Sequence, residues 1–212
     1  MKRTLLLLAV CLSLSAVGNA QTKKPVRKTT QTRTTQPVSK KAELPSANGK
    51  FKFDWTKGFV NDTDGKDFIV ISAPGKSVSD IKSSAVSALS DMYPNPNKVI
   101  STLGDNIINL NAYASDYFWY ESDEIIKIYS FNYNIKLEFK EGKIKVSSPS
   151  FSNITERRQS GSYVIGTSFI DVTKMYLLLY DIKRFDYSQL LADKFNSHVS
   201  KIVEGLSPNS DW

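Results

Sequence analysis

The sequence predicts an α+β fold in which a curved antiparallel sheet carries an N-terminal helix and a long C-terminal helix on one face. Residues 129–140 alternate between apolar and polar side chains without a break, which is the period of a strand with one buried face. Residues 78–93 and 187–206 carry apolar side chains at helical spacing, and Asp186 predicts the N-cap of the second helix. Stacking both helices on one face of the sheet buries all three apolar stripes.

The first half of the domain is predicted to contain a strand followed by a helix. Residues 66–72 (KDFIVIS) contain a short apolar run with β-branched side chains, and Pro74-Gly75 ends it, as is typical of a strand. Ser77 predicts the N-cap of the helix over 78–93, with Asp80 as its capping partner. The helix ends before two prolines, and its apolar stripe comprises Val78, Ile81, Ala85, Ala88 or Leu89, and Met92.

Two turns predict β-hairpins. Gly104-Asp105 separates apolar runs over 99–103 and 107–113. Glu141-Gly142 separates the alternating strand from the apolar residues after it. With Glu141-Gly142 as a two-residue loop, two apolar pairs face each other across the hairpin, so the register is self-consistent. The pairs are Leu137 with Val146 and Phe139 with Ile144.

The alternating strand is unusually long if it begins at Ile125. It then has about 16 residues, which predicts a bend or a bulge in a curved sheet. Beyond it the pattern weakens. Residues 152–173 have no clear period, and Met175–Ile182 are apolar throughout, so that they fit a buried strand or a helix equally well.

The first twenty residues have the features of an export signal. Lys2 and Arg3 precede a leucine-rich apolar run, and Gly18-Asn19-Ala20 supplies the small residues of a cleavage site. A membrane anchor would need about 20 apolar residues, more than this run has. A lipoprotein with a lipidated Cys11 is the alternative, and Val10 fits it poorly. We expect cleavage after Ala20, no transmembrane segment, and a location in the periplasm or at the cell surface.

Residues 21–50 are predicted to be a disordered basic linker, followed by one domain over 51–212. The linker is rich in Thr, Lys and Pro and carries eight basic residues against Glu43 alone. It is either a solvated spacer or a basic arm that contacts an anionic envelope surface. Residues 51–212 hold 18 basic and 20 acidic residues. A slightly acidic domain argues against nucleic-acid binding.

The sequence lacks the residue sets of common catalytic and metal sites. Cys11, the only cysteine, lies in the export signal and leaves with it, and His198 is the only histidine. We therefore expect no disulfide, no thiolate nucleophile, no metal site and no cofactor. Residues 60–65 resemble a calcium loop, but the register would put apolar residues at both ligating ends. We expect His198 to be a packed or solvated helix residue and the protein not to be an enzyme.

Four consecutive aromatic residues form the candidate binding site. Tyr117, Phe118, Trp119 and Tyr120 follow Tyr113 in an acidic stretch and fit neither a helical nor a strand period. We expect a loop that stacks on a sugar ring or seats a partner. The alternative is a loop whose rings fold back over the edge of the sheet.

Residues 68–155 resemble a domain of unknown function that is described as TBP-like and occurs in exported proteins of Bacteroidetes-type bacteria. The matching features are the strand Phe68–Ser72, the helix Val78–Tyr93, Lys98-Val99-Ile100 and the hairpin around Glu141-Gly142-Lys143. The resemblance implies a TBP-like α+β fold, with a helix-grip-like arrangement as the neighbouring possibility. It implies no activity and no site.

The function expected from the sequence is an exported, non-catalytic binding or interaction module for an unknown envelope glycan or protein. A carrier is the first alternative. It would hold a small hydrophobic ligand between the sheet and the C-terminal helix, in a cavity lined by Tyr129, Phe131 and Tyr133. An envelope hydrolase is the second alternative, and it would need convergent groups such as Asp116, Glu121 and His198.

Overall fold

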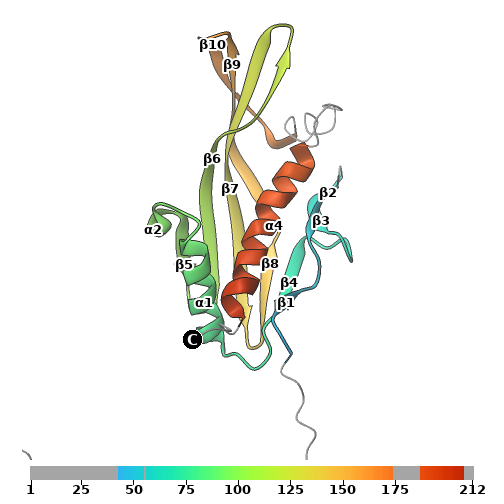
Figure 1. Ribbon diagram of the computed structural model, residues 1–212, viewed down its shortest axis with the longest axis vertical. Helices are drawn as coiled ribbons and strands as arrows, with labels where there is room; N and C mark the ends of the chain where they lie inside the picture. Colours follow the sequence, from blue (N-terminus) through green and yellow to red (C-terminus); the bar gives the residue numbers. More distant parts are fainter. Residues whose placement is uncertain (1–42, 55, 174–186, 208–212) are drawn as a thin grey trace, which may run out of the picture. The chain divides into compact units, whose positions relative to one another are not determined.

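Two long antiparallel strands, β6 and β7, form the centre of a mainly antiparallel sheet (Figure 1). The computed structural model describes residues 43–54, 56–173 and 187–207. The strands of the main sheet lie in the order β1-β4-β8-β7-β6-β5, and β9 joins β7 to β10. Their bounds are β1 Ser46–Ala47, β4 Phe68–Ser72, β5 Ile100–Leu103, β6 Ile107–Ser122, β7 Ile125–Lys140, β8 Lys143–Ser147, β9 Ser150–Ser160 and β10 Tyr163–Ile170.

The same edge of β7 pairs with two successive strands. Residues 137–140 of β7 pair with β8, and residues 126–134 pair with β9. The two ends of β7 therefore have different neighbours on this edge, β9 at the N-terminal end and β8 at the C-terminal end. We call the end formed by residues 118–122 of β6, 125–130 of β7, 154–160 of β9 and the whole of β10 the distal ribbon. In Figure 1 the ribbon continues past the start of α4 (Tyr187–Leu206).

The predicted hairpin register is confirmed. Leu137 faces Val146 and Phe139 faces Ile144, on the two sides of a turn in which Gly142 has φ +71°. The strand has the 16 residues expected when it starts at Ile125, and its pairing with β9 is irregular between Ser130 and Asn132. The alternation that is visible in the sequence thus corresponds to one fully buried face.

The N-terminal helix α1 (Val78–Ser90) begins as predicted and ends earlier. The Ser77 hydroxyl accepts a hydrogen bond from the Asp80 N–H over 3.2 Å, and Ile81, Ala85 and Leu89 are buried. A short helix, α2 (Pro96–Val99), follows it. The sequence does not predict α2, because Pro94 and Pro96 are typical of the end of a helix.

Helices α4 and α1 lie together on one face of the sheet, which we call the inner face (Figure 1). Gly205 of α4 approaches Ala88 and Ser84 of α1 so closely that an added Cβ would lie 2.8 Å from the Ala88 Cβ. The small residues let the two helices touch near the base of the sheet. The buried residues of α4 are Tyr187, Leu191, Ala192, Phe195, His198, Val199, Ile202 and Leu206. The sequence predicts an apolar stripe of Tyr187, Leu190, Leu191, Phe195, Ile202, Val203 and Leu206 on this helix. All but two of them are buried, since Val203 is half-buried and Leu190 is exposed.

A two-stranded sheet, β2 (Phe51–Asp54) with β3 (Gly58–Asn61), packs against α4. The Asn196 amide donates to the Phe51 carbonyl and accepts from the Phe51 N–H, over 3.0 and 2.7 Å. Phe59 packs edge-on against Phe195, with ring centroids 5.3 Å apart. This small sheet extends the core on the far side of the helix.

Two expectations are corrected by the structure, and one segment without a clear pattern receives an assignment. The ordered sheet begins at Ser46, within the predicted linker, because β1 pairs with β4. The aromatic cluster 117–120 lies within β6 and not in a loop. The weakly patterned residues 152–173 form most of the β9–β10 hairpin. The predictions for residues 1–42, for Met175–Ile182 and for Asp186 lie outside the described residues.

Candidate functional site

A bulge in β6 decides how the four aromatic residues are presented. Ala114 faces Phe131 and Phe118 faces Tyr129. Between these two pairs β6 therefore contains two more residues than β7. Asp116 takes up the extra chain in the left-handed region at φ +44°, and its N–H donates to the Ser130 hydroxyl over 2.8 Å. Because an even number of residues is inserted, the alternation of faces is preserved. The four consecutive aromatic residues therefore lie in the part of β6 that begins at the bulge.

Phe118 is a core residue and not part of a binding surface. It is 2% exposed. Its ring stacks on Tyr129 at 4.7 Å and lies 5.0 Å from the ring of Tyr187 at the start of α4. The aromatic character of this position is accounted for by packing between the ribbon and α4.

Tyr117 and Tyr120 are half-buried and engaged with the protein itself. The Tyr117 hydroxyl donates to the Leu190 carbonyl over 3.3 Å, and Lys194 Nζ lies 4.8 Å from the centre of its ring. Burial raises the pKa of Tyr117 to about 12. Tyr120 stacks on Tyr129 at 6.0 Å, with Lys127 5.2 Å from its ring centre. Both residues hold the ribbon in place.

Trp119 is the one member of the predicted cluster that presents most of its side chain to solvent. It is 56% exposed and lies on the face of the ribbon opposite to Phe118, which we call the outer face. Its carbonyl accepts a hydrogen bond from the Tyr187 hydroxyl. The position of the Trp119 backbone is thereby tied to α4, while its ring remains open to solvent.

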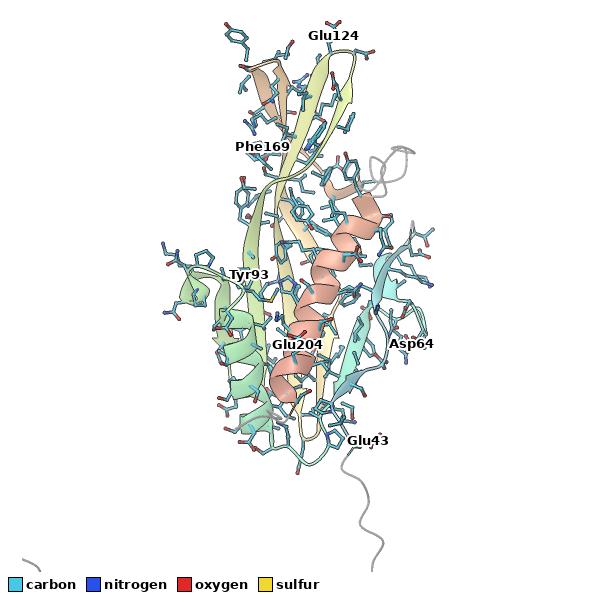
Figure 2. The ribbon with its side chains drawn as sticks, in the orientation of Figure 1. Glu43, Asp64, Tyr93, Glu124, Phe169 and Glu204 are labelled. Atoms are coloured by element: carbon cyan, nitrogen blue, oxygen red, sulfur yellow. The ribbon has the colours of Figure 1, made fainter. Side chains whose placement is uncertain are left out.

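The outer face carries three cross-strand rows of side chains. Residues that pair directly across neighbouring strands lie on the same face, with strands about 4.8 Å apart. The central row begins at Trp119. The other two rows end at Val164, which is 57% exposed, and at Phe169, which is 80% exposed and is labelled in Figure 2. The rows are Glu121–Ile126–Gln159–Val164, Trp119–Ile128–Arg157–Thr167 and Ser130–Thr155–Phe169.

One ion pair borders these rows. Arg157 donates to Asp116 over 2.7 Å, joining β9 to the bulge of β6. The guanidinium group therefore lies beside the row that contains Trp119. Sequence reasoning missed Arg157, Val164 and Phe169, because the β9–β10 hairpin shows no alternation that marks a buried face. The turn residues Ser160-Gly161-Ser162 were the available signal.

The inner face holds a buried polar chain that the sequence did not predict. The Tyr93 hydroxyl lies 2.5 Å from His198 Nε2 and 3.0 Å from the Tyr133 hydroxyl, and His198 Nδ1 lies 2.8 Å from the Lys194 carbonyl. A carbonyl only accepts, so Nδ1 carries the proton and Nε2 accepts from Tyr93. His198 is 2% exposed, and its burial lowers its pKa to about 4. The predicted packed histidine is confirmed.

Two of the three groups that the hydrolase alternative requires are engaged elsewhere. Asp116 pairs with Arg157, and His198 bonds to Tyr93 and Lys194. Glu121 faces Ile126 in the outer part of the β6–β7 pair. Among the residues that the structure describes, no group of three or more His, Cys, Asp or Glu side chains is placed to hold a metal ion.

A shallow groove of about 570 Å³ lies between the start of the domain and the second half of α4. It mixes acidic, basic and neutral polar side chains. Two of its charges are already engaged, since Asp62 accepts from the Lys50 N–H over 2.9 Å and Glu204 pairs with Lys201 over 2.8 Å. Its lining consists of Ala47, Gly49, Lys50, Asp62, Thr63, Asn196, Val199, Ser200, Val203 and Glu204.

None of the helices in the described part of the chain has the length and the apolar character that crossing a membrane requires.

Comparisons with known proteins assign no family to this chain. No family model matches it, and no curated protein matches it. A TBP-like protein from Parabacteroides distasonis aligns with a TM-score of 0.44 and 9% identity, over 66% of this chain and 90% of that one. A DUF4468 family protein from Bacteroides ovatus aligns with a TM-score of 0.38 and 11% identity, over 72% of this chain and 94% of that one. At this level of similarity neither structure assigns a family or an activity to the chain.

Proposed function

We propose that this protein is an exported, non-catalytic binding module whose contact surface is the outer face of the distal ribbon, with Trp119 as its anchor. The observation that carries the proposal is the 56% exposure of Trp119 on a strand whose neighbouring residues pack into the core. A large exposed ring on a well-ordered strand costs solubility and gains nothing for folding. Contact with a partner explains its presence.

The composition of the outer face supports a protein partner. Protein interfaces are enriched in Trp, Phe and Arg and depleted in Lys and Glu at their centres. Trp119, Phe169 and Arg157 occupy this face, and Val164, Ile126 and Ile128 fill the positions between them. The guanidinium of Arg157 is already oriented by Asp116, so less side-chain entropy is lost on binding. The envelope glycan expected as the alternative ligand becomes an outcome of the test.

The carrier alternative loses its support in the core. The cavity it requires would be lined by Tyr129, Phe131 and Tyr133. Tyr129 instead stacks on Phe118, Phe131 packs at 5.4 Å on Phe151, and Tyr133 packs at 5.5 Å on Phe195. These rings occupy the space between the sheet and α4. The aromatic residues of β7 are accounted for by packing.

The test compares two substitutions of exposed apolar residues. Trp119→Ala removes the proposed anchor, and Leu103→Ala is the matched control, since Leu103 is 52% exposed on the edge strand β5. Purified wild-type and variant proteins are immobilised and exposed to solubilised envelope proteins of the source cells, and separately to purified peptidoglycan sacculi. Retained protein is identified by mass spectrometry, and its affinity is then measured with the purified partner.

We expect a protein that is retained by the wild type and by Leu103→Ala and lost from Trp119→Ala. The loss of an anchoring tryptophan should weaken binding by at least about thirtyfold, which corresponds to about 2 kcal/mol. Retention on sacculi that depends on Trp119 would replace the protein partner with a glycan. Equal retention by all three proteins contradicts the proposal.

A further inference from the structure

We propose that two copies of this chain pair through the free edge of β10, antiparallel to each other, so that their distal ribbons join into one continuous sheet. In the described part of the chain β10 pairs with β9 on one side only. The inference is independent of the proposed function. It rests on the exposure, charge and register of Tyr163–Ile170.

The β10 edge lacks the features that protect other sheet edges from pairing. Natural edges are short, charged, or broken by proline. The other edges of the main sheet follow this rule. Strand β1 has 2 residues and β5 has 4. Beyond its pairing with β5, the edge of β6 over residues 111–122 is broken by the bulge at Asp116 and carries the charges of Asp116 and Glu121. Strand β10 has 8 residues, with the sequence YVIGTSFI, and contains no charge and no proline. It is the long, unprotected edge of the sheet.

Apolar side chains of β10 are exposed on both faces. Tyr163 is 82% exposed, and Ile165 is as exposed as Val164, at 57%. With Phe169 included, half of the strand consists of large apolar residues that are open to solvent. A surface of this kind is typical of an interface and not of a solvated edge. A partner strand would cover side chains on both faces at once.

The register of β10 is self-complementary. Ile165 is the extra residue of a bulge, since Val164 faces Gln159 and Gly166 faces Arg158. With the two-fold axis at Thr167 and the bulge skipped, every pair lies on a common face, as antiparallel pairing requires. The pairs are Thr167 with the second copy's Thr167, Gly166 with its Ser168, Val164 with its Phe169, and Tyr163 with its Ile170.

This pairing selects a second copy over an unrelated strand. Each large apolar residue that takes part meets another apolar residue, threonine meets threonine, and no like charges are opposed. Both copies supply the same eight residues, so one surface is complementary to itself, as a two-fold interface demands. A charged partner strand would find no opposite charge on β10. The chemistry of the edge therefore fits its own copy.

The pairing would also place both outer faces on the same side. A two-fold axis through adjacent antiparallel strands runs perpendicular to the sheet, so that Trp119 of each copy lies on one shared surface. That surface would present each contact residue twice. Bivalent engagement raises apparent affinity without new contacts.

The first experiment measures the oligomeric state of the full chain by sedimentation velocity over a range of protein concentrations, without a partner present. We expect a concentration-dependent dimer. Thr167→Lys brings two ammonium groups together at the axis and should raise the dimer dissociation constant at least about tenfold. Thr102→Lys is the matched control, because Thr102 is exposed on the other edge strand, β5. Circular dichroism melts confirm that both variants are folded.

The second experiment tests the register. In a Cys11→Ser background the chain has no cysteine, and Thr167→Cys then places two thiols opposite each other across the axis. Directly paired residues have Cα atoms about 4.5–5.5 Å apart, within reach of a disulfide. We expect at least about tenfold more cross-linked dimer on mild oxidation than for Thr102→Cys. A monomer at all concentrations overturns the proposal, as does a dimer that Thr167→Lys leaves intact and Thr167→Cys does not cross-link.

Discussion

The Tyr93 hydroxyl donates a hydrogen bond to His198 Nε2 over 2.5 Å, and this bond joins the segment after α1 to the middle of α4. Tyr133 of β7 extends the chain, since its hydroxyl lies 3.0 Å from that of Tyr93. The imidazole is thus held neutral between the Tyr93 hydroxyl, which donates to Nε2, and the Lys194 carbonyl, which accepts from Nδ1. The ammonium group of Lys194 faces the rings of Tyr117 and Tyr133 from the same helix.

The free energy of unfolding should fall as the pH is lowered, because the buried His198 resists protonation. The unfolded chain binds a proton near pH 6.5, whereas the folded pKa is about 4, so the unfolded state binds more protons between these values. The contribution is present in full above about pH 6.5 and is lost as the pH falls towards 4. It amounts to roughly 3 kcal/mol. Urea unfolding between pH 4 and 7.5 measures it.

His198→Gln is the control for the pH experiment, since it should remove this component of the pH dependence. His198 is also the only histidine of the chain, so one imidazole resonance in NMR reports its titration directly. A pKa near the ordinary value of 6.5 would show that the ring is hydrated in solution and would contradict the buried chain of hydrogen bonds.

Phe118 and Trp119 should behave oppositely although they are neighbours. Phe118→Ala empties a position between Tyr129 and Tyr187 and should cost about 3–5 kcal/mol of unfolding free energy. Trp119→Ala removes a ring that is largely in solvent and should cost less than about 1 kcal/mol. Thermal and urea unfolding compare the two variants. A larger loss for Trp119 would place its ring in the core and leave the outer face without its anchor.

The β7–β8 register gives a second matched pair. Leu137 is 1% exposed, and Leu137→Ala should cost about 2–5 kcal/mol. Lys136 lies on the other face, where it pairs with Glu138 over 3.1 Å in a solvent-screened ion pair. Lys136→Ala should change stability by no more than about 0.5 kcal/mol. A reversed order of the two costs would mean that the strand is displaced by one residue.

Gly205 should not tolerate alanine, although alanine is the better helix former. The new Cβ would lie 2.8 Å from the Ala88 Cβ and 3.3 Å from the Ser84 carbonyl oxygen. Overpacking of the α1–α4 contact should cost about 1–3 kcal/mol, more than the roughly 1 kcal/mol that alanine gains in an isolated helix.

The Gly205→Ala, Ala88→Gly double variant provides the control for this contact. It restores the space, so the two substitutions should couple, with the double variant more stable than the sum of the single effects predicts. Additive effects in the unfolding free energies would mean that the helices do not approach closely at this point.

The sequence by itself determined the elements whose signal is local. Ser77 and Asp80 mark the start of α1 through a bond between residues three apart. The alternation over 129–140 gives the buried face of β7, and Glu141-Gly142 sets the register with β8. In each case one apolar face meets one core, so the period of the sequence equals the period of burial.

Only the tertiary structure decided what the four aromatic residues do. At the bulge, Asp116 forms a hydrogen bond to Ser130 of β7 and an ion pair with Arg157 of β9. Both partners are distant in sequence, so the residues around Asp116 do not predict the bulge. The sequence also does not predict strand β10. Apolar side chains of β10 are exposed on both faces, so they show no alternation between buried and exposed positions. Burial of His198 and exposure of Trp119 are likewise set by strands and helices distant in sequence. Local periodicity encodes which face of an element is apolar, and the packing of other elements decides whether that face is covered.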